Sequence, residues 1–228
     1  MERLLMLNIS NKNVFVFDWD GTIFNSMEIK RMTFTDSFFE SISFEKGTIP
    51  DRNYVYDMYV KLSGVARKEI FSSILKSLGI PFNIEIYDKF NVNLTTENKK
   101  KLLTCSVFED AILFMKKILS KNGTIYLSSS VPMLELSYLT HNKINSEIFN
   151  NIQAIYGSSD TFKKGAEHFD SIIDETKCRK QDIIFFGDDY MDLVLCNKYG
   201  IDCILIDRNH LMKQEINIVN SFREIKID

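Results

Sequence analysis

Two aspartates separated by one residue follow a short apolar run near the start of the chain. The segment reads VFVFDWDGT, and it places Asp18 and Asp20 directly before Gly21 and Thr22. Side chains alternate along an extended strand, but a turn at Gly21 can bring both carboxylates towards one pocket. Carboxylates in one pocket repel, so they favour a cation such as Mg²⁺, beside which one could act as nucleophile and the other transfer a proton. The alternative is a polar strand end with an ordinary Asp-Gly turn.

A second acidic group follows another apolar run, in the segment IIFFGDDYMDL. Asp188 and Asp192 are four residues apart, with Asp189 between them. If a helix begins near Asp189, its first turn is acidic, which is also an ordinary capping pattern. Taken together with the first pair of aspartates, this group predicts further carboxylates that face a metal ion.

Hydroxyl and lysine side chains complete the set of candidate functional residues. In IYLSSSVP an apolar run ends at Ser128 and Ser129, shortly before Pro132 and an expected helix. A serine hydroxyl with backbone N–H groups at a helix N-terminus can bind phosphate, although the same pattern is also a common helix cap. In FKKG, Lys163 or Lys164 could neutralise phosphate charge, although most lysines are simply solvated.

The elements that must position these residues alternate between strands and helices. Near-continuous apolar runs of this length are typical of parallel strands with helices on both faces, whose ligands bind at the carboxyl ends. We predict strands at residues 14–17, 124–127, 153–156, 183–186 and 203–206. We predict the intervening helices at residues 108–119, 167–175 and 191–199.

The segment between the first two predicted strands has a different pattern. Residues 26–104 contain no convincing strand followed by a turn, and their apolar residues recur with helical spacing. We predict helices at residues 30–39, 53–62, 65–78 and 84–92. The chain is therefore predicted to form an α/β core from residues 1–25 and 105–228, with residues 26–104 as a helical insertion after the first strand. The many aromatic residues of the insertion are expected to form its core.

Composition excludes several classes of partner. The 228 residues carry a net charge of −3, and the densest basic cluster, residues 99–101, is predicted to be a solvated helix start, so nucleic acid is not expected. The four cysteines are scattered without a metal-binding spacing, which predicts reduced thiols and no zinc site. No apolar run approaches the roughly 20 residues of a membrane-spanning helix, and the N-terminus is a poor signal peptide. We expect a cytoplasmic protein that does not bind membranes.

The four motifs, in this order, resemble those of the haloacid dehalogenase superfamily. They are DWDGT (18–22), LSSS (127–130), FKKG (162–165) and GDDYMD (187–192), and they span nearly the whole chain. The resemblance implies a Rossmann-like parallel sheet with a helical cap of the C1 type inserted after strand 1. Such a cap is similar to those of the phosphoglycolate phosphatase and β-phosphoglucomutase branch.

The resemblance also implies a role for each residue of the first motif. Asp18 would be the nucleophile and would form an aspartyl-phosphate. Asp20 would be the general acid and base, and it would bind Mg²⁺ through its main-chain carbonyl. Gly21 and Thr22 would help to bind the phosphate. Dehalogenases of the superfamily lack the second aspartate, so Asp20 disfavours dehalogenation.

The later motifs would hold the phosphate and the metal. Ser128 would bind a phosphoryl oxygen, assisted by the backbone N–H of Ser129. Lys164 would be the motif lysine, with Lys163 as the alternative, because a glycine follows the lysine in many relatives. The metal ligands implied are Asp18, Asp20 and Asp188, supported by Asp192 and with Asp189 as a further candidate.

The resemblance implies a Mg²⁺-dependent phosphatase that acts on a small phosphorylated metabolite. A phosphomutase of the β-phosphoglucomutase type shares every motif, and a non-catalytic protein of this fold is a third hypothesis. Arg67 and Lys68 of the insertion are candidates for substrate recognition, against the alternative that they are solvated residues of a helix start. Trp19 could pack beneath the turn or narrow the pocket. No histidine lies in a motif, and the oligomeric state is not predicted.

Overall fold

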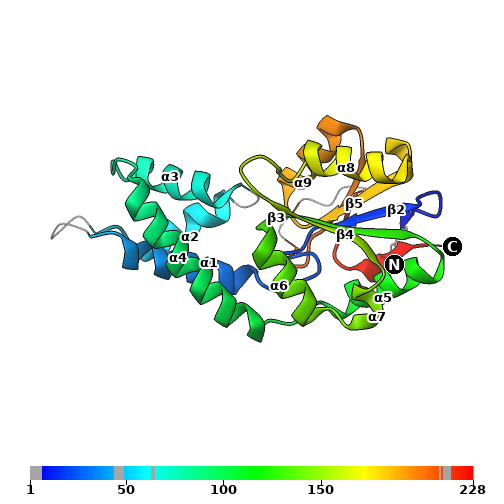
Figure 1. Cartoon of the computed structure of the whole chain (residues 1–228), viewed down its shortest axis with the longest axis horizontal. Coiled ribbons are helices and arrows are strands. Elements are labelled where there is room, and N and C mark those ends of the chain that lie inside the picture. The colour runs from blue at the N-terminus through cyan, green and yellow to red at the C-terminus, as the bar shows by residue number, and fades with distance from the viewer. Residues whose placement is uncertain (1–6, 44–48, 63–64, 211, 213–216, 228) are drawn as a thin grey trace. The chain divides into compact units, whose positions relative to one another are not determined.

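The chain forms two units in the computed structural model, which describes residues 7–43, 49–62, 65–210, 212 and 217–227. Met1–Asn25 and Ser106–Asp228 form one unit, termed here the core unit, and Ser26–Cys105 form the other, termed the helical unit. Figure 1 shows the first strand in blue beside strands from the green and yellow parts of the chain. The core unit is therefore assembled from segments on both sides of the inserted helices.

A parallel sheet of six strands, in the order β4-β3-β2-β5-β6-β7, forms the centre of the core unit. The α/β fold with a parallel sheet is thus confirmed, as are all five predicted strands. The strands are β2 (Val14–Phe17), β3 (Thr124–Pro132), β4 (Ile152–Ser158), β5 (Ile183–Gly187), β6 (Asp202–Ile206) and β7 (Ile218–Val219). The short strands β7, β1 (Leu7–Asn8) and β8 (Ile225–Lys226) were not predicted; at two residues each, they are too short to show a periodic pattern.

Strand β3 continues beyond the end that we predicted. The sequence indicated a strand that stops at Leu127 and a helix soon after Pro132, but β3 runs to Pro132 itself. Its pairing with β4 is irregular, because Ser128 pairs with Tyr156 and Pro132 with Ser158. Four residues of β3 therefore advance against two of β4. Such a bulge redirects side chains at a strand end, and here it involves the serine run.

Helices cover both faces of the sheet (Figure 1). On one face, α8 and α9 pack through Phe169 and Leu193 against Val14 and Val16 of β2. On the other face, the ring of Phe17 meets helix α5. The alternation of the β2 side chains between two apolar layers explains its unbroken apolar sequence. The helices of the core unit are α5 (Glu109–Ser120), α6 (Met133–Lys143), α7 (Ser146–Phe149), α8 (Ala166–Thr176) and α9 (Tyr190–Tyr199), with short 3₁₀ turns at Lys180–Asp182 and Phe222–Glu224.

The helical unit consists of α1 (Met27–Ser41), α2 (Arg52–Lys61), α3 (Arg67–Ser77), α4 (Ile84–Lys101) and a 3₁₀ turn at Leu102–Thr104. Its core is aromatic, as expected. The ring of Phe90 stacks on Phe71 at 4.5 Å and meets the edge of Phe34 at 5.0 Å. Among the described helices, none has the length and apolar character that a membrane crossing needs.

Capping residues define two helix starts in this unit, and one basic cluster defines an end. Asp51 accepts a hydrogen bond from Asn53 N at the start of α2, and Asn83 accepts one from Glu85 N at the start of α4. The lysines Lys99, Lys100 and Lys101 lie in the last turn of α4. The prediction of a helix start at residues 99–101 was therefore wrong, since basic residues favour the negative end of the helix dipole.

Candidate active site

Candidate residues of the core unit meet at the carboxyl edge of its sheet. Phe17 pairs with Leu127 on one side and with Phe186 on the other. The residues that follow these three in the chain are Asp18, Ser128 and Gly187, so the starts of the first, second and fourth motifs lie side by side. The chain leaves β2 towards β3 and later places β5 on the opposite side of β2, and this change of direction is where ligands bind in open α/β sheets.

Three aspartates gather at this edge. Asp18, Asp188 and Asp192 each offer one carboxylate oxygen, and these three oxygens lie within 4.8 Å of one another. Asp18 is 6% exposed and Asp192 is 2% exposed. Within the described residues, Asp192 Oδ2 is buried without a hydrogen-bond partner. Burying an unpaired carboxylate oxygen costs free energy, and such oxygens are good ligands for a hard divalent cation.

Two glycines allow these carboxylates to approach the backbone. Gly21 has a φ of +73°, and a Cβ on it would lie 1.8 Å from Asp188 Oδ2. A Cβ on Gly187 would lie 2.1 Å from Asp192 Oδ2. Both contacts are far shorter than van der Waals distance, so each position requires glycine while the carboxylates stay in place.

Lys164 is the cation of this cluster. Its Nζ lies 2.9 Å from Asp18 Oδ1 and 2.6 Å from Asp192 Oδ1, and its side chain is 8% exposed. Burial opposes the charge of this lysine, but Asp18 and Asp192 outweigh burial and raise its pKa. Lys163, in contrast, is exposed. Of the two lysines in FKKG, the structure therefore brings Lys164 to the carboxylates.

Burial dominates the electrostatics of the three aspartates. It raises the pKa of Asp18 to about 7, a shift that Lys164 reduces and that Asp192 and Asp20 increase. Burial likewise raises the pKa of Asp188, with repulsion from Asp18 adding to the effect, and it raises the pKa of Asp192 despite the nearby Lys164. One lysine thus does not neutralise these three carboxylates, of which Asp18 and Asp192 are buried, and the cluster favours additional positive charge.

Ser128 is held by a histidine that the sequence analysis did not select. Ser128 Oγ lies 2.8 Å from His168 Nδ1, and both residues are fully buried. Burial lowers the pKa of His168 to about 4, and the positive charge of Lys164 adds to this, so the imidazole is neutral near pH 7. His168 lies in α8 outside every motif, and only its position four residues after Lys164 could have drawn attention to it.

Ser129 is connected to the lysine loop through Ser158, which was also missed. Ser158 Oγ donates to the backbone carbonyl of Ser129 at 3.0 Å and accepts from the backbone N–H of Lys164 at 3.1 Å. The Ser129 hydroxyl accepts from Val131 N at 3.3 Å. Ser158 ends β4, so the polar end of a fourth strand was the available signal.

The other predicted residues lie near the cluster with different contacts. Asp20 is half-buried in the turn and is not one of the three clustered aspartates. Asp189 caps α9, since its side chain accepts from Met191 N at 2.8 Å, and it too lies outside that group. The Thr22 hydroxyl is buried, with no hydrogen-bond partner among the described residues. Trp19 is fully buried and stacks on Phe24 at 4.9 Å, so it packs beneath the turn.

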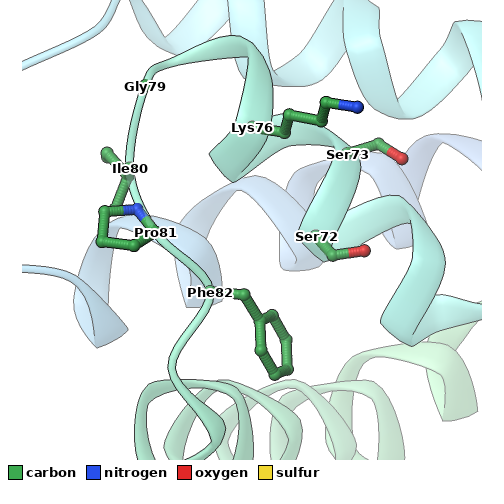
Figure 2. Close-up of a pocket in the computed structure, with 7 residues that line it drawn as sticks. All are labelled: Ser72, Ser73, Lys76, Gly79, Ile80, Pro81 and Phe82. Carbon is green, nitrogen blue, oxygen red and sulfur yellow. The ribbon is translucent and has the colours of Figure 1, made fainter.

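The two candidates of the helical unit contact other residues of that unit. Arg67 Nη1 donates to Asn91 Oδ1 at 2.8 Å and to Thr95 Oγ1 at 3.0 Å. Lys68 Nζ lies 5.8 Å from the centre of the Phe82 ring, within cation–π range. Phe82 also lines an open pocket of about 510 Å³ beside the end of α3 (Figure 2). The residues of this pocket are Ser72, Ser73, Lys76, Gly79, Ile80, Pro81 and Phe82.

Comparison with known protein families agrees with this arrangement. A model of the haloacid dehalogenase-like hydrolases matches residues 15–206, which include all four motifs. The chain belongs to this family. The match covers the strands from β2 to β6 and the helical unit, which together make up most of this haloacid dehalogenase-like hydrolase. Among curated proteins, no match was found.

Solved structures of similar fold include members of the same family. A predicted phosphoglycolate phosphatase from Haemophilus somnus 129pt is 12% identical, with a TM-score of 0.74 over 94% of this chain and 96% of that chain. CbbY from Rhodobacter sphaeroides, in complex with phosphate, is 14% identical, with a TM-score of 0.72 over 92% and 95%. A haloacid dehalogenase-like hydrolase from Streptococcus pneumoniae is 17% identical, with a TM-score of 0.69 over 95% and 97%. At these identities the likeness establishes the fold.

Proposed function

We propose that this haloacid dehalogenase-like hydrolase is a Mg²⁺-dependent phosphatase that hydrolyses a small phosphomonoester through an aspartyl-phosphate. The observation that carries the proposal is the buried Lys164, which lies 2.9 Å from Asp18 and 2.6 Å from Asp192 at the carboxyl edge of the sheet. A carboxylate nucleophile beside a buried cation suits attack on an anionic phosphoryl group, because the cation reduces the repulsion between them.

The donor set fits Mg²⁺. Three carboxylate oxygens within 4.8 Å of one another, one of them on a residue with an unpaired buried oxygen, offer the hard ligands that this ion takes. Asp18 and Asp188 would bind it through their carboxylates and Asp20 through its main-chain carbonyl, with Asp192 in support. When bound, Mg²⁺ would supply positive charge that stabilises the phosphoryl oxygens. Asp189, which caps α9, is the weakest candidate ligand.

Asp18 and Asp20 divide the chemistry. Asp18 Oδ attacks phosphorus, the bond from phosphorus to the ester oxygen breaks, and Asp20 gives its proton to the departing alcohol. Asp20 then takes a proton from water, and that water releases phosphate from Asp18. The half-buried position of Asp20 supports this role, because the acid must reach both the leaving group and solvent.

The remaining residues hold the phosphoryl oxygens. Ser128 donates its hydroxyl, Lys164 supplies a charge-assisted hydrogen bond, and the backbone N–H of Ser129 assists. If His168 Nδ1–H donates the hydrogen bond to Ser128 Oγ, the serine proton remains available to the phosphate. The backbone at Gly21 and Thr22 lines the same edge and would complete the oxyanion site.

The helical unit would act as a cap that excludes water and selects the substrate. Arg67 and Lys68 are candidates for contacts to the non-reacting part of the substrate. Their present contacts, to Asn91 and to the Phe82 ring, favour the alternative that they support the fold of α3 and α4. Single substitutions at these two positions test the two alternatives. A change in KM that is larger for one substrate than for another would support substrate contacts.

The substrate class proposed is a small phosphorylated metabolite such as phosphoglycolate, a sugar phosphate or a nucleoside monophosphate. Similar folds include a predicted phosphoglycolate phosphatase and a CbbY variant in complex with xylulose-(1,5)bisphosphate. Both names describe small phosphorylated compounds, and this supports starting with that class. A reducing cytoplasm is the proposed location.

The experiment is phosphate release from a panel of these phosphomonoesters, with Mg²⁺ or with EDTA, by the wild-type protein and by Asp18→Asn. We expect release that requires Mg²⁺ and falls at least about 10³-fold in the variant, because the nucleophile is lost. The control is Asp174→Asn, which removes the same charge from a side chain that is 83% exposed. Equal release by wild type and Asp18→Asn would contradict the proposal.

An absence of release from every compound would favour a different activity. Isomerisation of hexose 1-phosphates in the presence of a bisphosphate activator would then identify a phosphomutase, which uses the same nucleophile. Binding of phosphorylated compounds with neither activity would identify a non-catalytic protein.

A further inference from the structure

Arg208 contacts the first motif although it is 186 residues from Thr22 in sequence. It follows β6, outside all four motifs. Its Nε donates to the backbone carbonyl of Gly21 at 3.2 Å, and its Nη2 donates to the carbonyl of Thr22 at 2.9 Å. A single guanidinium thus holds two consecutive peptide groups of the turn that carries Asp18 and Asp20.

The guanidinium is fixed from two further directions. Its Nη1 lies 3.1 Å from Asp110 Oδ1, and its Cζ lies 3.6 Å from the centre of the Phe108 ring. The Arg208 side chain is 16% exposed. An ion pair and a stacked ring hold the planar group in one orientation, and only arginine offers several rigidly spaced donors for such a site.

Asp110 is itself held by the C-terminal segment. Its Oδ2 accepts from Ser221 Oγ at 2.6 Å and from Phe222 N at 3.0 Å. Burial alone would raise the pKa of Asp110, but the hydrogen bonds from Ser221 and Arg208 outweigh it and lower that pKa. Asp110 therefore stays ionised near neutral pH and keeps Arg208 in place.

The turn at residues 19–24 is closely packed, so a small shift of its backbone would change the contacts around it. Within the turn, Gly21 N donates to Phe24 O at 2.9 Å, and Ile23 N donates to Trp19 O at 3.0 Å. The carbonyls of Gly21 and Thr22 accept hydrogen bonds from Arg208. The Asp188 carboxylate lies so close to Gly21 that a Cβ there would be 1.8 Å from Oδ2. A small movement of Gly21 therefore alters the distance between Asp188 and the turn.

We propose that Arg208, oriented by Asp110 and Phe108, is a positioning residue that holds the Gly21–Thr22 backbone and thereby orients Asp18 and Asp20. The inference rests on the proposed function for its effect on rate, while its effect on the turn is independent of any activity. Removing the guanidinium leaves two carbonyls without their donor, so the turn gains freedom while the sheet beneath it remains intact.

The test compares Arg208→Met with Arg223→Met. Methionine retains much of the apolar length of arginine but has no donors. Arg223 is a matched control, since its Nη2 lies 3.7 Å from Glu109 Oε2, one residue before Asp110, and its side chain is 71% exposed. Hydrogen exchange is measured for a peptide covering residues 18–24, together with kcat and KM for phosphate release. The milder Arg208→Lys keeps the charge, and it is used as well in case the methionine variant does not fold.

For Arg208→Met we expect exchange in residues 18–24 to become about tenfold faster or more, with little change in β3 and β5. We expect kcat to fall about 10²-fold with KM nearly unchanged, because a displacement of reacting groups by about 1 Å has such an effect. Arg208→Lys should lie between the wild type and Arg208→Met in both measurements, and Arg223→Met should match wild type.

Unchanged exchange in residues 18–24 of a folded Arg208 variant would overturn the inference, and so would a uniform increase in exchange across the core unit. Normal kcat with faster exchange in the turn would also overturn it, because the turn would then not need to be held for the reaction. If wild type releases no phosphate from any compound, the proposed function fails, and the exchange measurement by itself decides whether Arg208 holds the turn.

Discussion

The nucleophile candidate Asp18 should destabilise the metal-free protein. Its side chain is 8% exposed, and burial raises its pKa to about 7, against 3.8 for a solvated aspartate. An acid whose pKa is raised by folding ionises more easily in the unfolded chain. The free energy of unfolding therefore decreases as pH rises from about 4 to about 7, and the loss is complete above pH 7.

The magnitude follows from the two pKa values. At about 1.4 kcal/mol per pKa unit, the full loss is about 4 kcal/mol, of which about 3 kcal/mol falls between pH 5 and pH 8. This is a large part of the total stability of an ordinary domain, which is about 5–15 kcal/mol. Asparagine resembles the protonated aspartate in shape, so Asp18→Asn should remove the penalty while it abolishes the proposed reaction.

The assay is urea unfolding of wild type and Asp18→Asn in EDTA at pH 5 and pH 8. The difference in free energy of unfolding between variant and wild type should grow in favour of the variant by about 3 kcal/mol from pH 5 to pH 8. The control Asp174→Asn removes a charge from a side chain that is 83% exposed, and its difference from wild type should hardly depend on pH.

The reasoning would be refuted if Asp18→Asn were less stable than wild type at pH 8, or if its advantage did not change between the two pH values. Either result would mean that Lys164, 2.9 Å away, compensates the buried charge of Asp18 fully. Adding Mg²⁺ should reduce the advantage of the variant, since the cation would stabilise the ionised cluster of wild type.

Three further predictions concern other residues of the site. Lys164→Met should lower kcat for phosphate release about 10²–10³-fold, because a buried charge at the phosphoryl group is lost. Lys163→Met should keep kcat within about twofold of wild type. The reverse pattern would reassign the motif lysine to Lys163. Gly187→Ala should weaken Mg²⁺ binding about 10-fold or more, as measured by calorimetric titration. The new methyl group would displace the Asp192 carboxylate, whose Oδ2 lies 2.1 Å from the Cβ position. An unchanged affinity would exclude Asp192 from the metal site. The pKa of His168 is about 4, against 6.5 for a solvated histidine, so only the unfolded chain gains the proton as pH falls from 6.5 to 4. The free energy of unfolding should therefore decrease by about 3 kcal/mol over this range. Unfolding curves of His168→Gln should lack this decrease, and an acid sensitivity equal to that of wild type would contradict the assignment.

Much of the fold could be predicted from the sequence because its pattern is local. Four apolar residues at 14–17 and the run at 183–186 are strands in the structure, with the two carboxylate motifs directly after them. The helical spacing of the inserted segment likewise predicted its four helices. Predictions were less successful where a tertiary contact extended an element, as in β3, whose serines pair with β4 instead of ending the strand.

The sequence by itself determined which residue types could form the site, since the motifs lie at or near the carboxyl ends of strands, and parallel strands end at one edge of a sheet. It favoured Lys164 over Lys163 only through the family resemblance, because the choice depends on how the loop before α8 directs each side chain. It also could not indicate His168 or Arg208. His168 meets Ser128 across 40 residues, and Arg208 meets Gly21 across 187. Such contacts arise from sheet register and helix packing, which bring distant side chains together without any local pattern.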